Sequence, residues 1–311
     1  MVVRSKKPWA ALLAIVLIIA SEIAFMTTTE SLTGLPYFQP TADDATIVAK
    51  RTLIPLAANK VVLVGDSSCM MGLNPVIMSK FSLDAINLGT LSTMTLEGFA
   101  ELAEEALKIT PPPKAIVLVV IPKAFGVTED QARKYNLLPR YLVAYGVTSG
   151  RIATTPRDRW STFTKKHVFN VFPQEFMSSY AAFERTLREK KGAFVETKTY
   201  QGTKEPVSTF EATDFAQRAL HRLSVAAIAK NIPLYLWISP TPADAVTEDY
   251  TNKANAFLAE LKKTEPSLQQ IYSKMPLWPP DCFGTVTHLN PVSAKVQSEE
   301  FANLFSRIHA N

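Results

Sequence analysis

Residues 61–75 read VVLVGDSSCMMGLNP, in which four aliphatic residues run directly into Gly65-Asp66-Ser67. A short, unbroken apolar run is typical of a strand that is buried on both faces, as in a parallel sheet. The loop after such a strand lies at the carboxyl edge of the sheet, where open α/β folds bind their ligands. The stretch therefore has two interpretations: an ordinary turn from a strand into a helix, or a nucleophilic serine, Ser67, held at the sheet edge.

Similar apolar runs recur along the chain, and amphipathic helices are expected between them. Buried strands are predicted over four ranges: 61–64, 86–88, 115–121 and 234–238. Apolar residues recur with helical spacing over 96–107 and 215–227, and a closing helix is expected after Asn290-Pro291. Strands that alternate with helices predict a three-layer α/β sandwich with a central parallel sheet, of the flavodoxin-like type.

The amino terminus carries a basic flank followed by an apolar segment. Arg4, Lys6 and Lys7 precede the apolar run within residues 8–26, which is just long enough to span a bilayer. A basic flank on the short leading side favours a cytoplasmic amino terminus. We expect a single-pass transmembrane anchor over residues 8–26, with the remainder of the chain outside. A cleaved signal peptide and a buried helix of a soluble domain are the alternatives.

The rest of the chain divides into a linker and a domain with an insertion. Residues 27–57 contain several prolines and little periodicity, and we expect a linker there. The globular domain is expected over 58–311. The alternation breaks over 126–206, which is rich in aromatic and cationic residues and has a helical pattern only over 175–191. This insertion is either a solvated, partly irregular segment or a cap over the sheet edge that holds an anionic acceptor or rests on lipid headgroups.

Composition narrows the partners and cofactors. The formal net charge of +5 over 311 residues favours an anionic partner such as a membrane surface or an acidic polymer. Nucleic acid is not expected as the partner of an exported domain. The sequence has no repeats, no zinc-type Cys/His spacing, no phosphate-binding loop and no dinucleotide fingerprint. We therefore expect neither a metal nor a cofactor.

A serine nucleophile needs a general base, and the four histidines of the chain differ in their suitability. His309 is nearly terminal, His221 lies within a helical stripe and His167 lies in the basic insertion. Only His288 lies on a loop, just before the last helix, that could reach the carboxyl edge of the sheet. We expect it to be the base for Ser67; a purely structural histidine is the alternative.

Three short motifs carry a resemblance to a known family. The GDS turn at 65–67, the INLG segment at 86–89 and the HLN sequence at 288–290 resemble, in this order, the SGNH (GDSL-type) hydrolase superfamily. The anchor and the ending HLN-P-x-x-A are similar to its exported branch in polymer O-acylation, which includes the alginate acetylation proteins and the D-alanyl transfer protein of teichoic acid operons. The resemblance spans roughly residues 60–305 and implies the SGNH fold.

The resemblance also implies roles for four residues. Ser67 would be the nucleophile and His288 the general base. The backbone N–H groups of Ser67 and Gly89 would stabilise the oxyanion. Asn87 would either replace a missing side-chain donor to the oxyanion, since the usual Gly-x-Asn-Asp block is absent, or close its own turn by local hydrogen bonding.

The residue that orients the histidine departs from the family pattern. The family usually places an aspartate three residues before the histidine, and this position is Thr285 here. Asp281, seven residues before His288, is the nearest carboxylate and is the expected orienting residue. If Asp281 cannot reach, the alternatives are a Ser–His dyad supported by the backbone or by Thr285, or an inactive site.

Taken together, the motifs predict a membrane-anchored, extracytoplasmic serine acyltransferase or esterase. It would act through an acyl-serine intermediate on acyl groups of a cell-envelope polysaccharide or glycolipid, with its catalytic domain in the periplasm or outside the cell. The resemblance implies a membrane-bound O-acyltransferase as partner. The alternatives are a simple carbohydrate or lipid esterase and a catalytically inactive binding or scaffold protein of an O-acylation complex.

The chain has only two cysteines, and both lie near expected site residues. Cys69 follows Ser67 by two residues, and Cys282 is adjacent to Asp281. Because disulfides persist in an exported domain, we expect a Cys69–Cys282 bond that joins the nucleophile turn to the histidine loop. Two separate thiols are the alternative.

Overall fold

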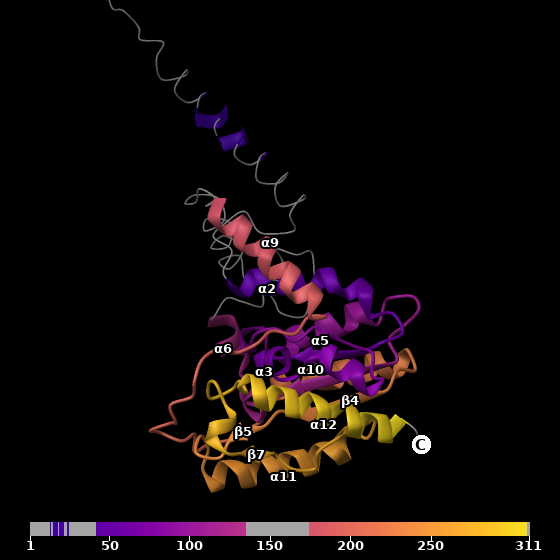
Figure 1. Cartoon of the computed structure of the whole chain (residues 1–311), viewed down its shortest axis with the longest axis vertical. Coiled ribbons are helices and arrows are strands. Elements are labelled where there is room, and N and C mark those ends of the chain that lie inside the picture. Colours follow the sequence, from indigo (N-terminus) through magenta and orange to yellow (C-terminus); the bar gives the residue numbers. More distant parts are fainter. Residues whose placement is uncertain are drawn as a thin grey trace, which may run out of the picture.

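The computed structural model describes residues 13, 15–17, 19–21, 24, 42–134 and 174–309. Its centre is a five-stranded sheet in which every pairing is parallel, with the order β2-β1-β3-β4-β6 (Figure 1). The strands are β1 (Val61–Gly65), β2 (Ala85–Asn87), β3 (Ala115–Val120), β4 (Leu234–Ile238) and β6 (Leu268–Gln270). The predicted α/β class with a parallel sheet is confirmed, and the strand order is that of doubly wound, flavodoxin-like sheets.

Helices connect these strands and cover both faces of the sheet. The helices are α2 (Ala42–Leu53), α3 (Ser67–Gly72), α4 (Pro75–Met78), α5 (Thr95–Ala106), α6 (Glu129–Lys134), α9 (Gln174–Glu189), α10 (Asp214–Ala229), α11 (Glu248–Thr264) and α12 (Pro291–His309). Short 3₁₀ turns are η1 (Ile54–Ala57), η2 (Ser79–Phe81), η3 (Ser92–Met94), η4 (Pro122–Gly126) and η5 (Pro280–Cys282). Two further strands, β5 (Thr241–Pro242) and β7 (Leu277–Trp278), form a small parallel pair.

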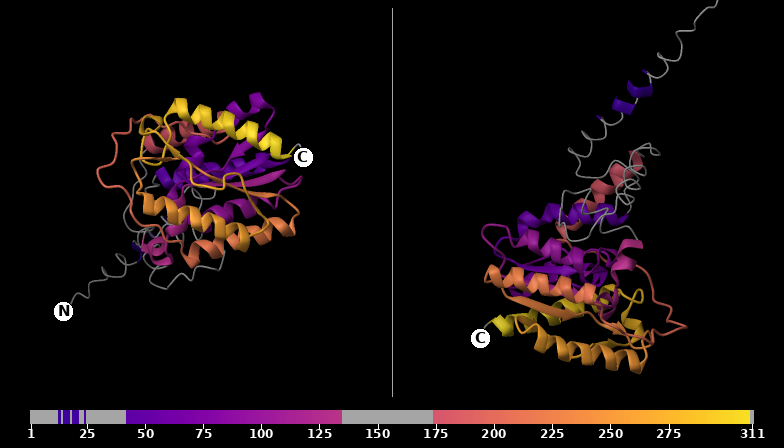
Figure 2. Two further views of the ribbon diagram at one scale, coloured as in Figure 1. Left: turned by 90° about the horizontal axis from the view of Figure 1, so that it is seen from below. Right: turned by 180° about the vertical axis from the view of Figure 1, so that it is seen from behind.

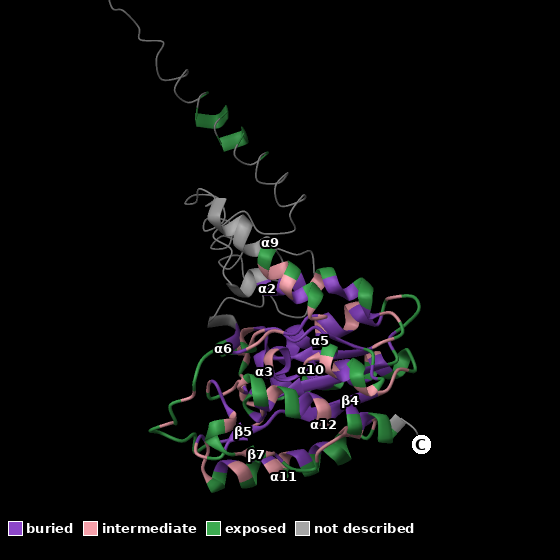
Figure 3. Cartoon of the chain, in the orientation of Figure 1, coloured by how far each residue is buried: buried purple, intermediate pink, exposed green. Residues whose placement is uncertain are grey.

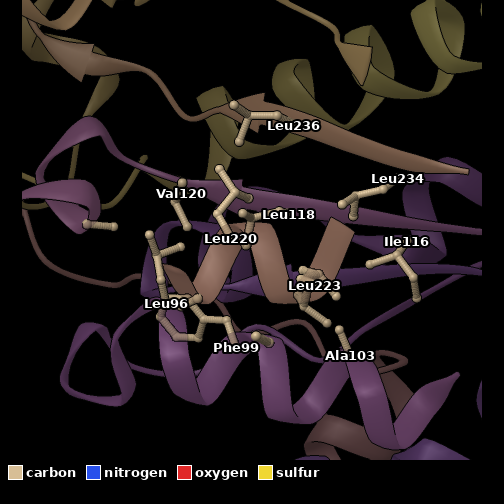
Figure 4. Close-up of a cluster of buried hydrophobic side chains, with 14 of the residues drawn as sticks. Leu96, Phe99, Ala103, Ile116, Leu118, Val120, Leu220, Leu223, Leu234 and Leu236 are labelled. Atoms are coloured by element: carbon tan, nitrogen blue, oxygen red, sulfur yellow. The ribbon is translucent and has the colours of Figure 1, made fainter. Parts of the chain in front are cut away.

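Two apolar clusters lie on opposite faces of the sheet, because successive residues of a strand point to opposite sides. Val62 and Val64 of β1 face the cluster that is formed with α5, α10 and α11, part of which is shown in Figure 4. Val61 and Leu63 face the smaller cluster that is formed with α12 and the residues after β1. Strands β1, β2, β3 and β4 are buried throughout, whereas β6 and β7 each have one exposed residue. Figure 3 shows exposed residues on the outer sides of the covering helices. Strands β1, β3 and β4 are therefore continuous apolar runs, as the sequence suggested.

The carboxyl edge of β1 is the topological switch point of the sheet. From β1 the chain passes to β2 on one side, and then crosses β1 to reach β3 on the other side. In open α/β sheets, ligand sites lie in the crevice outside the carboxyl ends of strands at such a point. Ser67 opens α3 directly after β1 and so lies at this crevice.

The structure differs from the sequence-based expectation at the linker. Its second half is helical, since α2 covers residues 42–53 and η1 covers 54–57. Lys50 and Leu53 are fully buried, and α2 lies beside α9, as both Figure 1 and Figure 2 show. The helical segment predicted within the insertion is confirmed as α9. Residues 135–173 of the insertion, residues 27–41 of the linker and most of the expected anchor lie outside the described residues; among those that are described, no helix is both long enough and apolar enough to cross a membrane.

Candidate active site

The turn that carries Ser67 is built by its two preceding residues. Gly65 has a φ of 156°, and a Cβ atom at this position would lie 1.7 Å from the carbonyl oxygen of Val119, so only glycine fits between β1 and β3. Asp66 is the N-cap of α3, and its carboxylate accepts a hydrogen bond of 2.8 Å from the backbone N–H of Ser68. Ser67 is thereby fixed as the first residue of α3.

The structure brings Ser67 and His288 together across the whole domain. His288 Nε2 lies 2.8 Å from Ser67 Oγ, and His288 Nδ1 lies 2.7 Å from Oε2 of Glu196. The side chain of His288 is 16% exposed, whereas that of Glu196 is 8% exposed. Ser67, His288 and Glu196 therefore form one continuous Ser–His–Glu chain. They come from the start of α3, the loop before α12 and the segment after α9.

Glu196 is held in its charged form by the hydrogen bonds around it. Oε1 accepts hydrogen bonds of 2.8 Å from the backbone N–H groups of Thr197 and Lys198, while Oε2 faces His288. Burial by itself would raise the pKa of Glu196, but the hydrogen bonds from Lys198, His288 and Thr197 outweigh it, and the pKa is lowered. An ionised carboxylate only accepts hydrogen bonds, so His288 donates from Nδ1 and leaves Nε2 free to accept from the Ser67 hydroxyl.

The carboxylate beside His288 is thus Glu196 and not Asp281, which corrects the sequence-based expectation. Asp281 lies exposed in η5, and its backbone carbonyl accepts a hydrogen bond of 2.7 Å from the Asn290 side chain. That bond ties η5 to the first turn of α12, where Asn290 Oδ1 in turn accepts from the Ser293 N–H. Asp281 therefore shapes the loop through its backbone, while Nδ1 of His288 is already occupied by Glu196.

Thr285 supports His288 through the backbone and not through the imidazole. Its Oγ1 accepts a hydrogen bond of 3.1 Å from the His288 N–H, which closes a tight turn before the histidine. Gly284, one residue earlier, lies against Glu196: a Cβ atom there would be 2.6 Å from Cγ of Glu196 and 2.7 Å from the carbonyl oxygen of Lys198. The absence of a side chain at Gly284 therefore lets the glutamate segment approach the histidine loop.

Asn87 and Gly89 do not serve as the expected oxyanion donors. The Nδ2 group of Asn87 donates to the carbonyl oxygens of Cys69 (2.8 Å) and Leu73 (2.7 Å), and its Oδ1 accepts from the Gly89 N–H (2.8 Å). Asn87 is completely buried, and these bonds hold α3 against the end of β2. Of the two backbone donors that we expected, only the N–H of Ser67 has no hydrogen-bond partner among the described residues.

Behind the nucleophile, Asp66 is part of a buried polar cluster. Its carboxylate accepts from the Ser68 hydroxyl and from the Ile121 N–H (3.1 Å), and the Ser68 hydroxyl lies 2.8 Å from that of Ser239. Burial raises the pKa of Asp66, while the hydrogen bonds from Ser68 and Ile121 and the charge of nearby His288 act in the opposite direction. These contacts fix the ends of β1, β3 and β4 relative to one another, so Asp66 has a structural role.

The expected disulfide is not formed, because Cys69 and Cys282 are both free thiols. Cys69 is a completely buried residue of α3, and its Sγ lies 3.6 Å from Oδ1 of Asn87. Burial raises the pKa of this thiol. Cys282 lies at the end of η5, where its backbone carbonyl accepts from the Asn290 N–H. The histidine loop is instead joined to the rest of the site by Glu196.

Glu196 was missed at the level of the sequence, for identifiable reasons. It lies 92 residues before His288, in a stretch without regular secondary structure inside the insertion. The one local signal is a carboxylate that directly follows three apolar residues in the run AFVETK, which is weak in a segment with many charges. Among the described residues no group of three or more His, Cys, Asp or Glu side chains could hold a metal ion.

This arrangement can perform nucleophilic acyl chemistry, because it contains a hydroxyl, a base within hydrogen-bond distance and an orienting carboxylate. Comparisons with models of protein families, with curated proteins and with solved structures found no match to this chain. The fold therefore defines the class of this protein: it is an α/β domain with a five-stranded parallel sheet.

Proposed function

We propose that this protein is a serine acyltransferase or esterase that works through an acyl-Ser67 intermediate. The observation that carries the proposal is the hydrogen-bonded order Ser67–His288–Glu196 at the switch point of the sheet. Together with the GDS, INLG and HLN motifs, this order supports a member of the SGNH type in which the acid comes from the insertion and not from the histidine loop. A protein that used His288 only structurally would not need an ionised, hydrogen-bonded glutamate behind it.

In the proposed reaction, His288 Nε2 takes the proton from Ser67 Oγ as that oxygen attacks the acyl carbon. Glu196 keeps Nδ1 protonated and stabilises the imidazolium that forms. The imidazolium then gives its proton to the departing alcohol, and an acyl-Ser67 ester remains. In the second half, His288 activates water in an esterase, or an acceptor hydroxyl in a transferase, and the ester is cleaved.

The negative charge that develops on the acyl oxygen needs donors. The backbone N–H of Ser67 is the donor that the surrounding hydrogen bonds leave available among those expected from the motifs. The Gly89 N–H donates to Asn87 Oδ1, and the Nδ2 group of Asn87 donates to the carbonyls of Cys69 and Leu73. Among the described residues, neither of them therefore replaces the side-chain donor that the family usually supplies. Removal of one such donor costs about 3–4 kcal/mol in other serine enzymes, so we expect a slow enzyme unless the bound substrate completes the site.

The substrate class that we propose is an acylated polysaccharide or glycolipid of the cell envelope, with a membrane-bound O-acyltransferase as the protein that supplies the acyl group. These proposals rest on the resemblance to the exported branch and on the basic flank and apolar run of residues 4–26. A protein so anchored would work in the periplasm or outside the cell, close to the membrane surface.

Labelling with a fluorophosphonate tests the chemistry. We expect the domain to be labelled, the adduct to map to Ser67 and the label to disappear in Ser67→Ala. Ser79, an exposed serine in η2, provides the matched control, since Ser79→Ala should label like the wild type. A folded protein that is not labelled, or is labelled elsewhere, would favour the inactive scaffold over the enzyme.

A second assay separates the two enzyme classes. An esterase would release p-nitrophenol from p-nitrophenyl acetate with multiple turnovers in water alone. A transferase would give a burst and then turn over only when a sugar hydroxyl is supplied. The burst with little hydrolysis is the result we expect, because the acyl-serine must survive until the acceptor arrives.

A further inference from the structure

Lys50 of α2 is a fully buried lysine with an unusual set of partners. Its Nζ donates to the carbonyl oxygens of Asn87 (3.0 Å) and of Gly192. Among the residues that the structure describes, no carboxylate faces it. Removing an ammonium group from water without an opposite charge costs several kcal/mol, so two carbonyl contacts alone would not favour keeping a lysine here. The positions of those two carbonyl groups in the fold indicate what the amine of Lys50 holds together.

Both carbonyls belong to the junction between β2 and the segment that leaves α9. Strand β2 is at the edge of the sheet, and the N–H of Asn87 donates to the carbonyl of Lys191 (2.9 Å) instead of to another strand. Gly192 packs so closely that a Cβ atom would lie 1.8 Å from the Asn87 carbonyl oxygen, and its φ is 94°. Lys50 bridges the carbonyls on the two sides of this contact.

From this junction the chain reaches Glu196 in four residues. Halfway along, the N–H of Phe194 donates to the carbonyl of Met70 in α3 (2.9 Å), so the segment is attached to the nucleophile helix as well. Two residues later, Glu196 meets His288. The segment has no regular secondary structure over this stretch, so its path is set by these tertiary contacts.

We infer that Lys50 is a positioning residue, which fixes the segment 191–194 on the edge of β2 and so places Glu196 against His288. The inference rests on the proposed function, and it makes α2 part of the support of the triad. Burial lowers the pKa of Lys50 to about 7. The nearby thiol of Cys69, which is also buried, acts in the opposite direction and raises this pKa. Both the ammonium and the neutral amine carry N–H groups that can donate to the two carbonyls.

A double-mutant cycle on the labelling rate tests this role. Lys50→Met keeps the apolar length of the side chain and removes the donors, and we expect labelling of Ser67 to slow by about 10²-fold, the order of effect of a misplaced catalytic group. In the Glu196→Gln background the same change should slow labelling by less than about threefold, since residues that act as a unit are not additive. Lys80→Met removes an exposed ammonium in η2, outside the segment 191–198, and should label like the wild type.

A purely structural lysine would slow labelling by the same factor in both backgrounds, and this result would overturn the inference. If Lys50→Met does not fold, Lys50→Leu, which also has no N–H donor, takes its place in the cycle. A second readout needs no activity: the low-field proton resonance of His288 Nδ1–H should be lost in Glu196→Gln and in the Lys50 variant, but kept in Lys80→Met. Its persistence in the Lys50 variant would refute the positioning role, whereas an unlabelled wild type with these resonance changes would count against the proposed function alone.

Discussion

The two sides of the candidate active site are built in different ways. The turn that carries Ser67, the proposed nucleophile, is local. A buried strand, a position where only glycine fits and an aspartate N-cap place Ser67 within seven residues of chain. The acid segment, residues 191–198, has no strand or helix of its own and is placed by contacts to β2, α3 and the loop of Gly284. The comparison teaches that a nucleophile can be predicted from local sequence, whereas its acid can depend entirely on tertiary contacts.

The nucleophile side should show the largest effects. Ser67→Ala and His288→Ala should each lower acyl transfer by about 10⁴-fold or more, because each removes a member of a group that acts as a unit. The double variant should be hardly slower than either single variant. Rates of p-nitrophenol release from p-nitrophenyl acetate measure these losses. Full activity in Ser67→Ala would refute the proposed nucleophile. Additive losses in the double variant would show that His288 acts independently of Ser67.

On the acid side, a smaller change tests the close approach at Gly284. Gly284→Ala places a methyl group where Cγ of Glu196 is only 2.6 Å away, so the glutamate must move away from the histidine loop. We expect labelling to slow by about 10- to 10²-fold while the fold is retained. Val286→Ala, a change of an exposed side chain in the same loop, serves as the control. Unchanged labelling in a folded Gly284→Ala protein would show that the acid segment tolerates movement.

The support of the acid segment should be visible in the pH dependence of stability. The pKa of Lys50 is about 7 in the folded protein against an ordinary value of 10.5, so between these pH values the unfolded chain binds one more proton. The free energy of unfolding should therefore gain about 1.4 kcal/mol per pH unit from this group as pH rises from 7 to 10.5, and this gain should be lost again as pH falls. Below pH 7 the contribution should be flat.

Urea unfolding at several pH values between 7.5 and 9.5 measures this contribution as a difference between the wild type and Lys50→Met. Other titrating groups are common to both proteins, so the difference should change by about 1.4 kcal/mol per pH unit. Two stability curves that run parallel across this range would show that Lys50 keeps its ordinary pKa in the fold.

The sequence predicted what local patterns encode. The apolar runs predicted four of the five strands of the central sheet with nearly the observed bounds, and helical spacing predicted α5, α10 and α12. Strand β6 was missed because it has only three residues, one of them exposed, which is too few for a pattern. Helix α2 was assigned to a linker because prolines flank it (Pro40 and Pro55) and because polar residues interrupt its buried face.

The site shows the same division. Ser67 and His288 were predicted because one follows a buried strand and the other precedes a helix, and the structure brings the two side chains together. Asp281 was favoured because it is close in sequence, but its side chain lies exposed while Glu196, 92 residues from His288, occupies the contact. The oxyanion role of Asn87 failed because a buried amide must satisfy its own hydrogen bonds, and those partners are backbone groups of α3 that only the folded chain brings near.

The most direct test compares Glu196→Gln with Asp281→Asn in the rate of fluorophosphonate labelling at Ser67. Both variants replace a carboxylate by an amide of the same shape, so volume is conserved. The account predicts that Glu196→Gln slows labelling by at least about 10²-fold, since the amide no longer holds the imidazole in the required tautomer, while Asp281→Asn labels like the wild type. A wild-type rate in Glu196→Gln together with a large loss in Asp281→Asn would contradict it.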